Sequence, residues 1–458
     1  MKNVALHNLG CKVNSYEIEV MQQKFEKKGY EIVPFAPGAD IYVINTCTVT
    51  NIADRKSRQM LHKAKKMNPK SIVVATGCYV QTGENTIKTD ECIDLAIGNN
   101  CKKDIVEIVE EYIKEKEESQ KRVLIDINKT SEYEEMQLTK TAEHTRAYIK
   151  IQDGCNQFCS YCIIPYARGR VRSRKPEDVL SEIKGLVEAG YQEFVITGIH
   201  LSSYGLDFLD KNSKDYLSGE KDIREAVYKK GFLITLLKNI QDIEGVKRIR
   251  LGSLEPRIIT EEFAKELASL NKVCPHFHLS LQSGSDTVLK RMNRHYNTKE
   301  YLERVEILRK YYKNPAITTD IIVGFPQETE EEFKETMEYV KTVNFYEVHI
   351  FKYSKREGTV AAAMSGQLTE KVKAERSSLL NEIVQKQSAE YRAGFVGKEV
   401  SVLIEETKEI DGKAYAVGHT PEYVMVAVTS ASQETWPPAN TFVKGIAKEL
   451  PGTDMLLL

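Results

Sequence analysis

Three closely spaced cysteines, Cys155, Cys159 and Cys162, carry the clearest chemical signal in the chain. Their spacing is C-x3-C-x2-C, and the aromatic residue Tyr161 stands directly before the last of them. An ordinary 4Fe-4S cluster takes four thiolates, so three thiolates leave one iron with an open coordination position. S-adenosylmethionine can chelate that iron through its amino and carboxylate groups. The pattern therefore predicts a 4Fe-4S cluster that binds S-adenosylmethionine.

Zinc is the alternative metal for these three thiols. A structural zinc site takes a fourth Cys or His ligand at matching spacing, and no His or Cys follows closely after Cys162. The motif also comes directly after an expected strand at 147–151, and the catalytic groups of a βα barrel gather at the carboxyl ends of its strands. Both observations favour the iron-sulfur cluster.

Three further cysteines, Cys11, Cys47 and Cys78, each stand at the end of an expected N-terminal strand. The carboxyl ends of parallel strands meet at one edge of a sheet, where ligands bind. We therefore expect these thiolates to converge on a second iron-sulfur cluster. The alternative is that they are small buried hydrophobic side chains, a common role for cysteine. The remaining cysteines show no such regularity and are interpreted as structural: Cys92, Cys101 and Cys274.

Polar residues and glycine at other strand ends supply candidate contacts for the cofactor. Each is weak evidence alone, because a strand must end in something polar, but together they outline one site. With Tyr161 of the cysteine motif, the residues expected to bind S-adenosylmethionine are Thr197, Gly198, Ser253, Glu255 and Gln282. His200 and Asp320 stand at strand ends of the same kind.

The elements that must position the second set of cysteines form a βαβα series. Apolar stretches at 4–6, 41–44 and 72–75 alternate with helical patterns at 15–28 and 52–67. Such a series predicts a parallel sheet with helices on its faces, and we assign residues 1–118 to an N-terminal domain. The charged stretch 107–122 is interpreted as a solvated helix, and the polar, aperiodic residues 126–143 as a linker.

A second βα series positions the first set. Its expected strands are 147–151, 193–197, 247–251, 276–282, 319–323 and 347–351, and helical patterns lie between them. Six βα units predict an open, partial (β/α)6 barrel, which we assign to residues 141–371. A helix at 369–391 leads to four short strands at 398–405, 413–418, 423–428 and 442–447. These strands predict a small β-barrel domain at 395–455.

Length and composition agree with this division, since 458 residues suffice for about three domains. No run of about 18 apolar residues occurs, so no membrane span is expected. The first residues lack the apolar segment of an export signal and the nine cysteines are odd in number, so we expect a cytoplasmic protein without a disulfide framework. Lys and Arg total 65 against 66 Asp and Glu, so any nucleic acid must bind a local basic surface.

In combination, these motifs resemble the radical S-adenosylmethionine methylthiotransferases over nearly the whole chain. The similar N-terminal segments are 9–14 (LGCKVN), 45–49 (NTCTV) and 76–78 (TGC), and the similar central segments are 153–169, 278–285 (HLSLQSGS), 289–294 (LKRMNR) and 320–326 (DIIVGFP). The C-terminal barrel is similar to the TRAM module with which such enzymes hold RNA. Gln327 departs from the family, which usually has glycine there.

Within the family, segments 9–14 and 150–156 resemble the group that acts on threonylcarbamoyladenosine at position 37 of tRNA. The resemblance implies two 4Fe-4S clusters, S-adenosylmethionine, an electron donor and the tRNA anticodon loop as substrate. It further implies that a radical formed at the Cys155, Cys159 and Cys162 cluster takes the hydrogen from carbon 2 of the adenine, to which the other cluster presents methylated sulfur. We expect a monomer.

Three alternatives stay open. The first is methylthiolation of isopentenyladenosine at the same tRNA position, and the second is methylthiolation of an aspartate in a small-subunit ribosomal protein. The third is a non-enzymatic iron-sulfur protein that binds RNA and senses redox state. Incomplete thiolate ligation argues against the third, because pure electron carriage favours a fully ligated cluster.

Charge distribution indicates where RNA would be held. Residues 395–458 hold five Lys against nine Asp and Glu, so this acidic barrel is a poor anchor for phosphates. Residues 54–70 and 140–175 each carry a net charge of +6. The second stretch includes an alternating run of arginines, Arg168, Arg170, Arg172 and Arg174. We expect these two stretches to make much of the contact with RNA.

Overall fold

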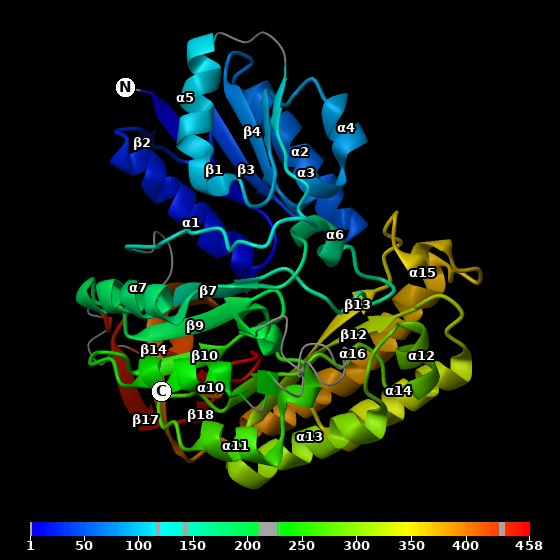
Figure 1. Cartoon of the computed structure of the whole chain (residues 1–458). Helices are drawn as coiled ribbons and strands as arrows, with labels where there is room; N and C mark the ends of the chain where they lie inside the picture. Colours follow the sequence, from blue (N-terminus) through cyan, green and yellow to red (C-terminus); the bar gives the residue numbers. More distant parts are fainter. Residues whose placement is uncertain (1, 116–119, 141–144, 210–226, 229, 430–435) are drawn as a thin grey trace.

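The computed structural model describes residues 2–115, 120–140, 145–209, 227–228, 230–429 and 436–458. Figure 1 shows an N-terminal domain (blue to cyan) beside an open arrangement of strands and helices (green to orange), with the C-terminal sheet (red) against the latter. The predicted α/β class, with an N-terminal parallel sheet, a central partial barrel and a small C-terminal β domain, is confirmed. No helix in these ranges is long and apolar enough to cross a membrane.

The N-terminal sheet is parallel, with the strand order β2-β1-β3-β4-β5-β6. Its strands are β1 (Asn3–Asn8), β2 (Glu31–Ile32), β3 (Ile41–Thr46), β4 (Ile72–Gly77), β5 (Leu95–Ile97) and β6 (Lys121–Val123). The three strands predicted from the sequence are confirmed. The three that the sequence pattern missed have only two or three residues each, which is too short to show an apolar period.

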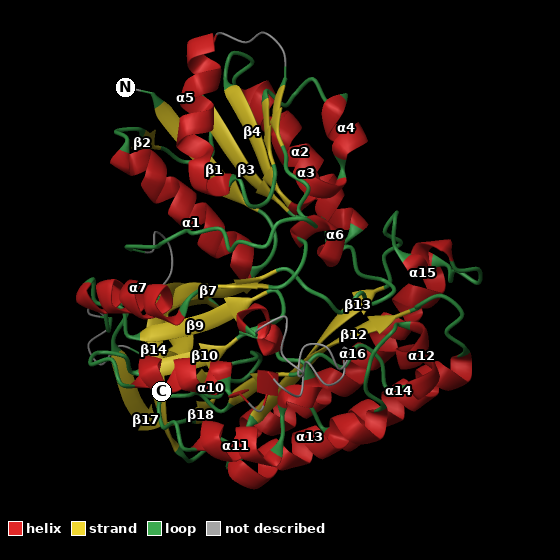
Figure 2. Ribbon diagram, in the orientation of Figure 1, coloured by secondary structure: helices red, strands yellow, loops and turns green. Residues whose placement is uncertain are grey.

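Helices cover both faces of this sheet (Figure 2). They are α1 (Lys12–Lys27), α2 (Asn51–Met67), α3 (Cys78–Thr82), α4 (Glu84–Lys88), the short helix η1 (Lys102–Asp104) and α5 (Ile105–Glu115). Helices α1 and α5 share one apolar core with the sheet, and α2 packs on the opposite face. The predicted solvated helix at 107–122 is shorter and amphipathic, since Ile105, Val109 and Tyr112 on its inner face are buried.

The central strands form a curved, open barrel. They are β7 (Ala147–Asp153), β8 (Arg172–Ser173), β9 (Glu193–Gly198), β10 (Arg248–Leu251), β11 (His276–His278), β12 (Ala316–Val323) and β13 (Glu347–Lys352). Two sheets, β10-β9-β7-β8 and β11-β12-β13, are joined by isolated bridges from Ile249 to Val273 and from Leu254 to Leu279. The predicted strand at 276–282 is shorter than expected: β11 ends at His278, and beyond it Gln282, whose φ is +76°, forms only an isolated parallel bridge with Ile321 of β12.

The helices of the central region follow its strands, as predicted. They are α6 (Ile164–Arg168), α7 (Pro176–Glu188), α10 (Phe232–Gln241), α11 (Glu261–Ala268), α12 (Asp286–Arg291), α13 (Thr298–Tyr311), α14 (Glu330–Val343), α15 (Val360–Ala363) and α16 (Glu370–Ala393), with short helices η2 (Leu201–Ser203), η3 (Leu206–Phe208) and η4 (Pro256–Ile258). Gln327 has a φ of +65°, a left-handed conformation that favours glycine. This conformation explains why the family usually has glycine there.

The predicted linker is irregular but packed. Ile127, Met136 and Leu138 are at most 2% exposed and anchor it between the N-terminal domain and the barrel. The hydroxyl of Tyr16 in α1 donates a hydrogen bond of 2.5 Å to the Met136 carbonyl. Residues 141–144 of this segment lie outside the described ranges.

The C-terminal sheet has the order β17-β14-β15-β16-β19-β18. Its strands are β14 (Glu399–Ile410), β15 (Lys413–His419), β16 (Met425–Val428), β17 (Phe442–Ile446), β18 (Lys448–Glu449) and β19 (Leu456–Leu457). It docks on β10, where Arg248 donates to the Ser401 carbonyl (2.7 Å) and Arg250 to the Thr420 and Pro421 carbonyls (2.6 and 2.7 Å). Both arginines are buried, so the C-terminal sheet packs directly against this part of the barrel.

Candidate metal centres

The cysteines Cys11, Cys47 and Cys78 follow three adjacent parallel strands, β1, β3 and β4. A side chain at Gly10, whose φ is +116°, would lie 3.1 Å from the Cys47 sulfur, so only glycine allows the β1 loop to approach so closely. Burial and the neighbouring Cys78 and Cys11 raise the pKa of the Cys47 thiol to about 12. Cys78 and Cys11 therefore lie close enough to the Cys47 sulfur to disfavour its ionisation. Cys47 and Cys78 are buried, whereas Cys11 is exposed.

The second set, Cys155, Cys159 and Cys162, occupies the loop after β7. The Cys162 amide donates to the Cys159 carbonyl (3.0 Å), which closes a turn between them. Burial raises the pKa of Cys162, and the neighbouring Cys159 and Cys155 raise it further. Arg294 donates to the Cys159 sulfur at 3.2 Å, and the Gln157 amide donates to the Cys155 sulfur at 3.4 Å. These three thiols also converge.

Each set fits an iron-sulfur cluster by its donor chemistry. A thiol whose pKa is raised by burial and by neighbouring thiols, as at Cys47 and Cys162, ionises only when a positive group compensates it, and the iron of a cluster would supply that charge. Each set also has an arginine that donates to one sulfur, Arg168 at 3.2 Å from Cys78 and Arg294 at 3.2 Å from Cys159. Hydrogen bonds to cluster sulfurs are one of the means by which proteins adjust the reduction potential of such clusters.

Arg168 lies in the interior between the two domains and is fully buried. Its Nε donates to the Cys78 sulfur, and its NH1 donates to Glu17 (2.8 Å) and to Asp153 (3.1 and 3.2 Å). Its NH2 donates to the Asn14 side-chain oxygen at 2.7 Å. One side chain of the central domain therefore contacts α1, the N-terminal cysteines and the end of β7.

Two buried lysines complete this ion network. Lys102 donates to Glu17, and Lys150 contacts Glu17 at 2.8 Å and Asp153 at 2.6 Å. Burial alone would raise the pKa of Glu17, but Arg168, Lys102 and Lys150 hold it well below its ordinary value. Glu17 is therefore ionised, and the network joins the N-terminal domain to the barrel through charged side chains that water does not reach.

The expectation that the arginine run binds RNA is wrong for three of its four members. Arg168, Arg172 and Arg174 are at most 1% exposed, whereas Arg170 is exposed and lies over the Phe158 ring at 4.5 Å. The buried members have partners from the interior: Arg174 pairs with Glu182, and Arg172 lies 3.9 Å from Asp153. Sequence charge counts do not distinguish a phosphate-binding arginine from one buried beside a carboxylate.

The predicted cofactor contacts lie around the carboxyl ends of the barrel strands. Thr197 is buried and Gly198 half-buried at the end of β9, Ser253 is exposed and Glu255 buried after β10, and Gln282 is buried after β11. The Tyr161 ring packs with the apolar cluster of Val288, Met292, Phe325, Tyr353 and Ala361. Burial first, and then Cys159, raise its pKa. That these six residues bind S-adenosylmethionine remains a prediction.

Glu255 is the ionised member of that set. Burial alone would raise its pKa, but Arg257, His200 and Arg294 lower it. Arg257 donates to Glu255 at 2.6 Å. Because Arg294 also contacts Cys159, it connects the carboxylate to the cysteine loop. The sequence reasoning missed Arg294 and Arg168 as sulfur contacts, and the only available signal was their place in the motifs 289–294 and 153–169.

Asp320 lies beside two histidines on one face of three adjacent strands. His278 Nε2 is 3.2 Å from the Asp320 carboxylate, and the His278 and His349 rings are stacked with centroids 5.7 Å apart. Phe351, two residues beyond His349 on β13, is 44% exposed. Strand alternation places these side chains on the same face of the barrel.

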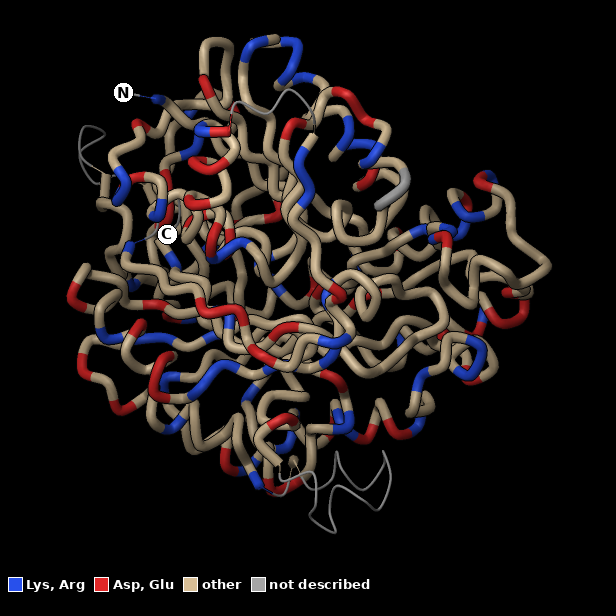
Figure 3. Tube along the Cα trace, turned by 45° about the horizontal axis from the view of Figure 1, so that its top comes forward, with Lys and Arg blue, Asp and Glu red and all other residues tan. Residues whose placement is uncertain are grey.

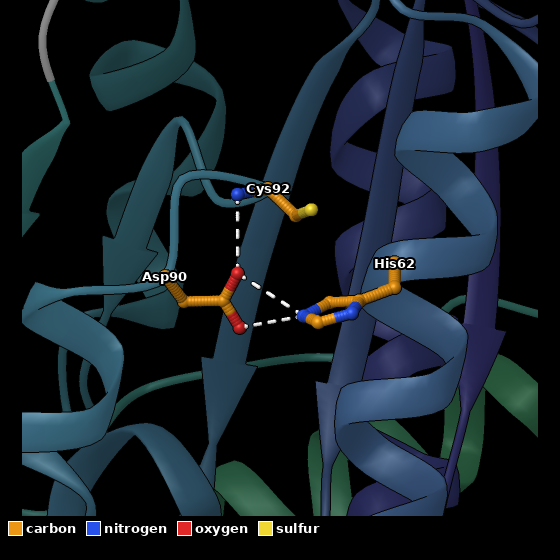
Figure 4. Close-up of side chains that lie close together, drawn as sticks. All are labelled: His62, Asp90 and Cys92. Atoms are coloured by element: carbon orange, nitrogen blue, oxygen red, sulfur yellow. Dashed lines mark hydrogen bonds and ion pairs between the residues drawn. The ribbon is translucent and has the colours of Figure 1, made fainter.

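Cys92, which the sequence analysis assigned to structure, lies beside His62 and Asp90 (Figure 4). His62 Nε2 is 3.2 and 2.9 Å from the Asp90 carboxylate oxygens, and the Cys92 amide donates to the same carboxylate at 3.1 Å. These contacts tie α2 to the turn before β5. Hydrogen bonding by Asp90 therefore accounts for the arrangement. Cys101 and Cys274 are buried.

Known proteins match both halves of the chain. Residues 149–340 match the radical SAM superfamily, and residues 3–98 match uncharacterized protein family UPF0004. The threonylcarbamoyladenosine tRNA methylthiotransferase MtaB of Bacillus subtilis is 42% identical, over 93% of this chain and 90% of its own. The chain belongs to the radical S-adenosylmethionine methylthiotransferase family. The family uses S-adenosylmethionine and 4Fe-4S clusters, so the predicted cofactors and enzyme class are confirmed.

Other members of the family are similar to a comparable degree. MtaB of Aquifex aeolicus is 40% identical, over 89% of this chain and 94% of its own. A tRNA-2-methylthio-N(6)-dimethylallyladenosine synthase of Thermoanaerobacter is 37% identical, over 90% of this chain and 84% of its own. Among solved structures, the radical S-adenosylmethionine methyltransferase TsrM from Kitasatospora setae has a TM-score of 0.54 at 14% identity, over 79% of this chain and 74% of that one. That likeness shows a shared fold.

Proposed function

We propose that this methylthiotransferase acts on threonylcarbamoyladenosine at position 37 of tRNA and adds the methylthio group at carbon 2. The higher identity to the two MtaB enzymes, 42% and 40% against 37% for the dimethylallyladenosine enzyme, supports this substrate. The observation that carries the reaction type is the pair of three-cysteine sets at strand ends, one contacted by the Arg168 side chain and the other by the Gly169 carbonyl. Residues 1–118, 141–371 and 395–455 would be the methylthiotransferase, radical and TRAM domains.

The cysteines divide the chemistry between two centres. Cys155, Cys159 and Cys162 would hold the cluster that binds S-adenosylmethionine, and the N-terminal set, Cys11, Cys47 and Cys78, would hold the second. When bound, these groups supply reductive cleavage of S-adenosylmethionine and the sulfur that is transferred. The chain positions them, and the burial of Cys47, Cys78 and Cys155 limits the access of water to both centres.

The cofactor would lie along the strand ends, against Tyr161, Thr197, Gly198, Ser253, Glu255 and Gln282. Glu255 carries a buried negative charge beside this row, which favours the positively charged sulfonium and amino groups of S-adenosylmethionine. Arg257 donates to that carboxylate at 2.6 Å and fixes its orientation, and Arg294 helps to lower its pKa.

Helix α2 would be a principal tRNA-binding surface. It begins at Asn51, four residues after Cys47, so its first turn lies beside the N-terminal cysteines. Its exposed basic residues are Arg55, Lys56, Lys63 and Lys66. Figure 3 shows basic and acidic residues interspersed along most of the trace, in agreement with the near-neutral net charge of the whole chain. Phosphates of the anticodon loop would bind this helix, while the acidic C-terminal barrel contributes shape and hydrogen bonds.

Phe351 would stack on a base of the anticodon loop. Its ring is 44% exposed near the carboxyl end of β13, the same end of the barrel that carries the cysteine loop. Stacking on an aromatic ring contributes about 1–3 kcal/mol per base. Phe351→Ala should therefore weaken tRNA binding, whereas Phe351→Tyr should retain it. Equal binding by both variants in a tRNA titration would exclude this role.

Nucleoside mass spectrometry tests the substrate. Bulk tRNA from cells that lack this chain should lose 2-methylthio-threonylcarbamoyladenosine and regain it when the chain is restored. Loss of the methylthio-isopentenyl nucleoside instead would show that the substrate is isopentenyladenosine, the first alternative of the sequence analysis. Unchanged tRNA, with a loss of methylthio-aspartate from a ribosomal protein, would support the second.

We further propose that the protein is a cytoplasmic monomer that receives its electrons from a separate donor protein. Light scattering on the reconstituted protein should give the mass of one chain, 52.1 kDa. A chemical reductant should replace the donor in the assay, and a stable dimer would contradict the monomer.

A further inference from the structure

We propose that Arg168 is a positioning residue for the N-terminal cluster: it donates a hydrogen bond to a cluster sulfur and thereby raises the cluster's reduction potential. The inference rests on the proposed function, because it takes Cys11, Cys47 and Cys78 as cluster ligands. It adds a specific electrostatic connection between the second cluster and the loop of the first.

The contact geometry supports a directed interaction. Arg168 Nε lies 3.2 Å from the Cys78 sulfur, and the side chain is fully buried. The other two nitrogens of the guanidinium are bound by Glu17, Asp153 and Asn14. These partners hold the planar group from its far side and fix the direction in which Nε points.

The charged groups around Arg168 have a net positive charge that a bound anion would neutralise. Ion pairs in this network join four cations, Lys102, Lys150, Arg168 and Arg172, to the carboxylates Glu17 and Asp153, and the buried carboxylate of Glu134 interacts with Lys102 and Lys150. Even with every carboxylate ionised, this group has one positive charge in excess. A cluster held by three thiolates is negatively charged and would balance it. Arg168 is the cation of the group that contacts a cysteine sulfur.

The same segment contacts the first cluster's loop. The carbonyl of Gly169 accepts a hydrogen bond of 3.0 Å from the Cys155 amide, directly beside Arg168 in the chain. A side chain at Gly154 would lie 1.9 Å from the Arg170 carbonyl, so the loop is pressed against this segment. Residues 168 and 169 therefore touch a ligand of each proposed cluster.

The effect on potential follows from charge. One-electron reduction adds a negative charge to the cluster, and a buried cation that donates to its sulfur stabilises the reduced state more than the oxidised one. Removing the cation should shift the midpoint potential to more negative values. Burial makes the effect larger than it would be at the surface, because the local dielectric constant is low.

The experiment isolates the N-terminal cluster in the full chain. Replacing Cys155, Cys159 and Cys162 by alanine removes the other cluster, and the remaining one is titrated anaerobically by electron paramagnetic resonance. In this background Arg168→Gln should give a more negative midpoint potential, and Arg168→Lys a smaller shift. Arg174→Gln is the matched control, because it removes an equally buried charge of the same segment that pairs with Glu182 and donates to the Tyr16 hydroxyl.

The outcomes separate this inference from the proposed function. An unchanged potential in Arg168→Gln, or an equal shift in Arg174→Gln, overturns the inference. If Arg168→Gln fails to hold a cluster, the test is made on the alanine background that retains Arg168, labelled with ¹⁵N-arginine. Pulsed paramagnetic resonance should then detect a nitrogen coupling to the reduced cluster, and the absence of this coupling overturns the proposal. Failure of the Cys155, Cys159 and Cys162 background to bind any iron would instead contradict the two-cluster assignment.

Discussion

Replacing Glu17 by glutamine removes one charge from the buried network that joins the N-terminal domain to the barrel. Glu17 is fully buried and forms ion pairs with Lys102, Lys150 and Arg168. The variant therefore removes a carboxylate that all three buried cations share. Removing one partner of a buried ion pair costs about 3–5 kcal/mol. With about 2–4 °C per kcal/mol for a domain of 150–250 residues, the Tm of the metal-free protein should fall by roughly 6–20 °C.

The assay is calorimetry of the metal-free, reduced protein at neutral pH, which avoids any contribution from cluster loss. Glu26→Gln is the matched control, because it lies on the same helix and pairs with Lys140 at 2.9 Å in a partly exposed position. An exposed pair contributes about 0–1 kcal/mol, so this control should change Tm little. Equal Tm values for the two variants would refute the reasoning that the buried network stabilises the domain interface.

The same network gives a pH dependence with a definite sign. The folded-state pKa of Glu17 is held below its ordinary value, so its contribution to stability is fully present above about pH 4.3 and is lost as the pH falls towards the folded-state value. The difference in Tm between the parent and Glu17→Gln should therefore be constant near neutrality and narrow below about pH 4. A difference that stays constant into acid would show that Glu17 is not the titrating group.

Three further predictions concern the cysteines and the proposed RNA-binding surface of helix α2. Cys155→Ala should halve the iron of the reconstituted protein, and iron equal to that of the parent would contradict the assignment of this ligand. Cys47→Ala should still form deoxyadenosine from S-adenosylmethionine yet give no methylthio nucleoside, whereas a merely structural cysteine would cost about 1 kcal/mol and leave both products. The double variant Lys56→Gln, Lys63→Gln should weaken tRNA binding and reduce the salt slope by about one per lost phosphate contact; Lys413→Gln on the acidic barrel is the control, and equal slopes would exclude α2.

The architecture and the two cysteine sets could be predicted from the sequence. Parallel strands place their carboxyl ends at one edge of a sheet, so Cys11, Cys47 and Cys78 had to converge once β1, β3 and β4 were adjacent. Cys155 and Cys159 lie close together because only three residues separate them in the chain. Local pattern decides such features because it acts within one strand or one loop.

The interior charges were decided by the tertiary structure. Arg168, Arg172 and Arg174 had the sequence pattern of an RNA-binding surface, but folding places Glu17, Asp153 and Glu182 against them. The partner carboxylates are separated from the arginines by up to 151 residues in the chain, as between Arg168 and Glu17. A charge count over a short window contains no information about contacts at that separation.

The docking of the C-terminal sheet is a second feature that only the tertiary structure shows. Strands β14 to β17 follow from alternation and turn residues, whereas their attachment depends on Arg248 and Arg250 of β10 reaching the Ser401 and Thr420 carbonyls. Strand alternation determines which face of a sheet is apolar, but the partner of that face is set by the shape and hydrogen-bonding groups of a distant surface. The sequence by itself therefore determined the two sets of cysteines and the strands that carry them, and tertiary packing decided which charged residues lie between the two sets.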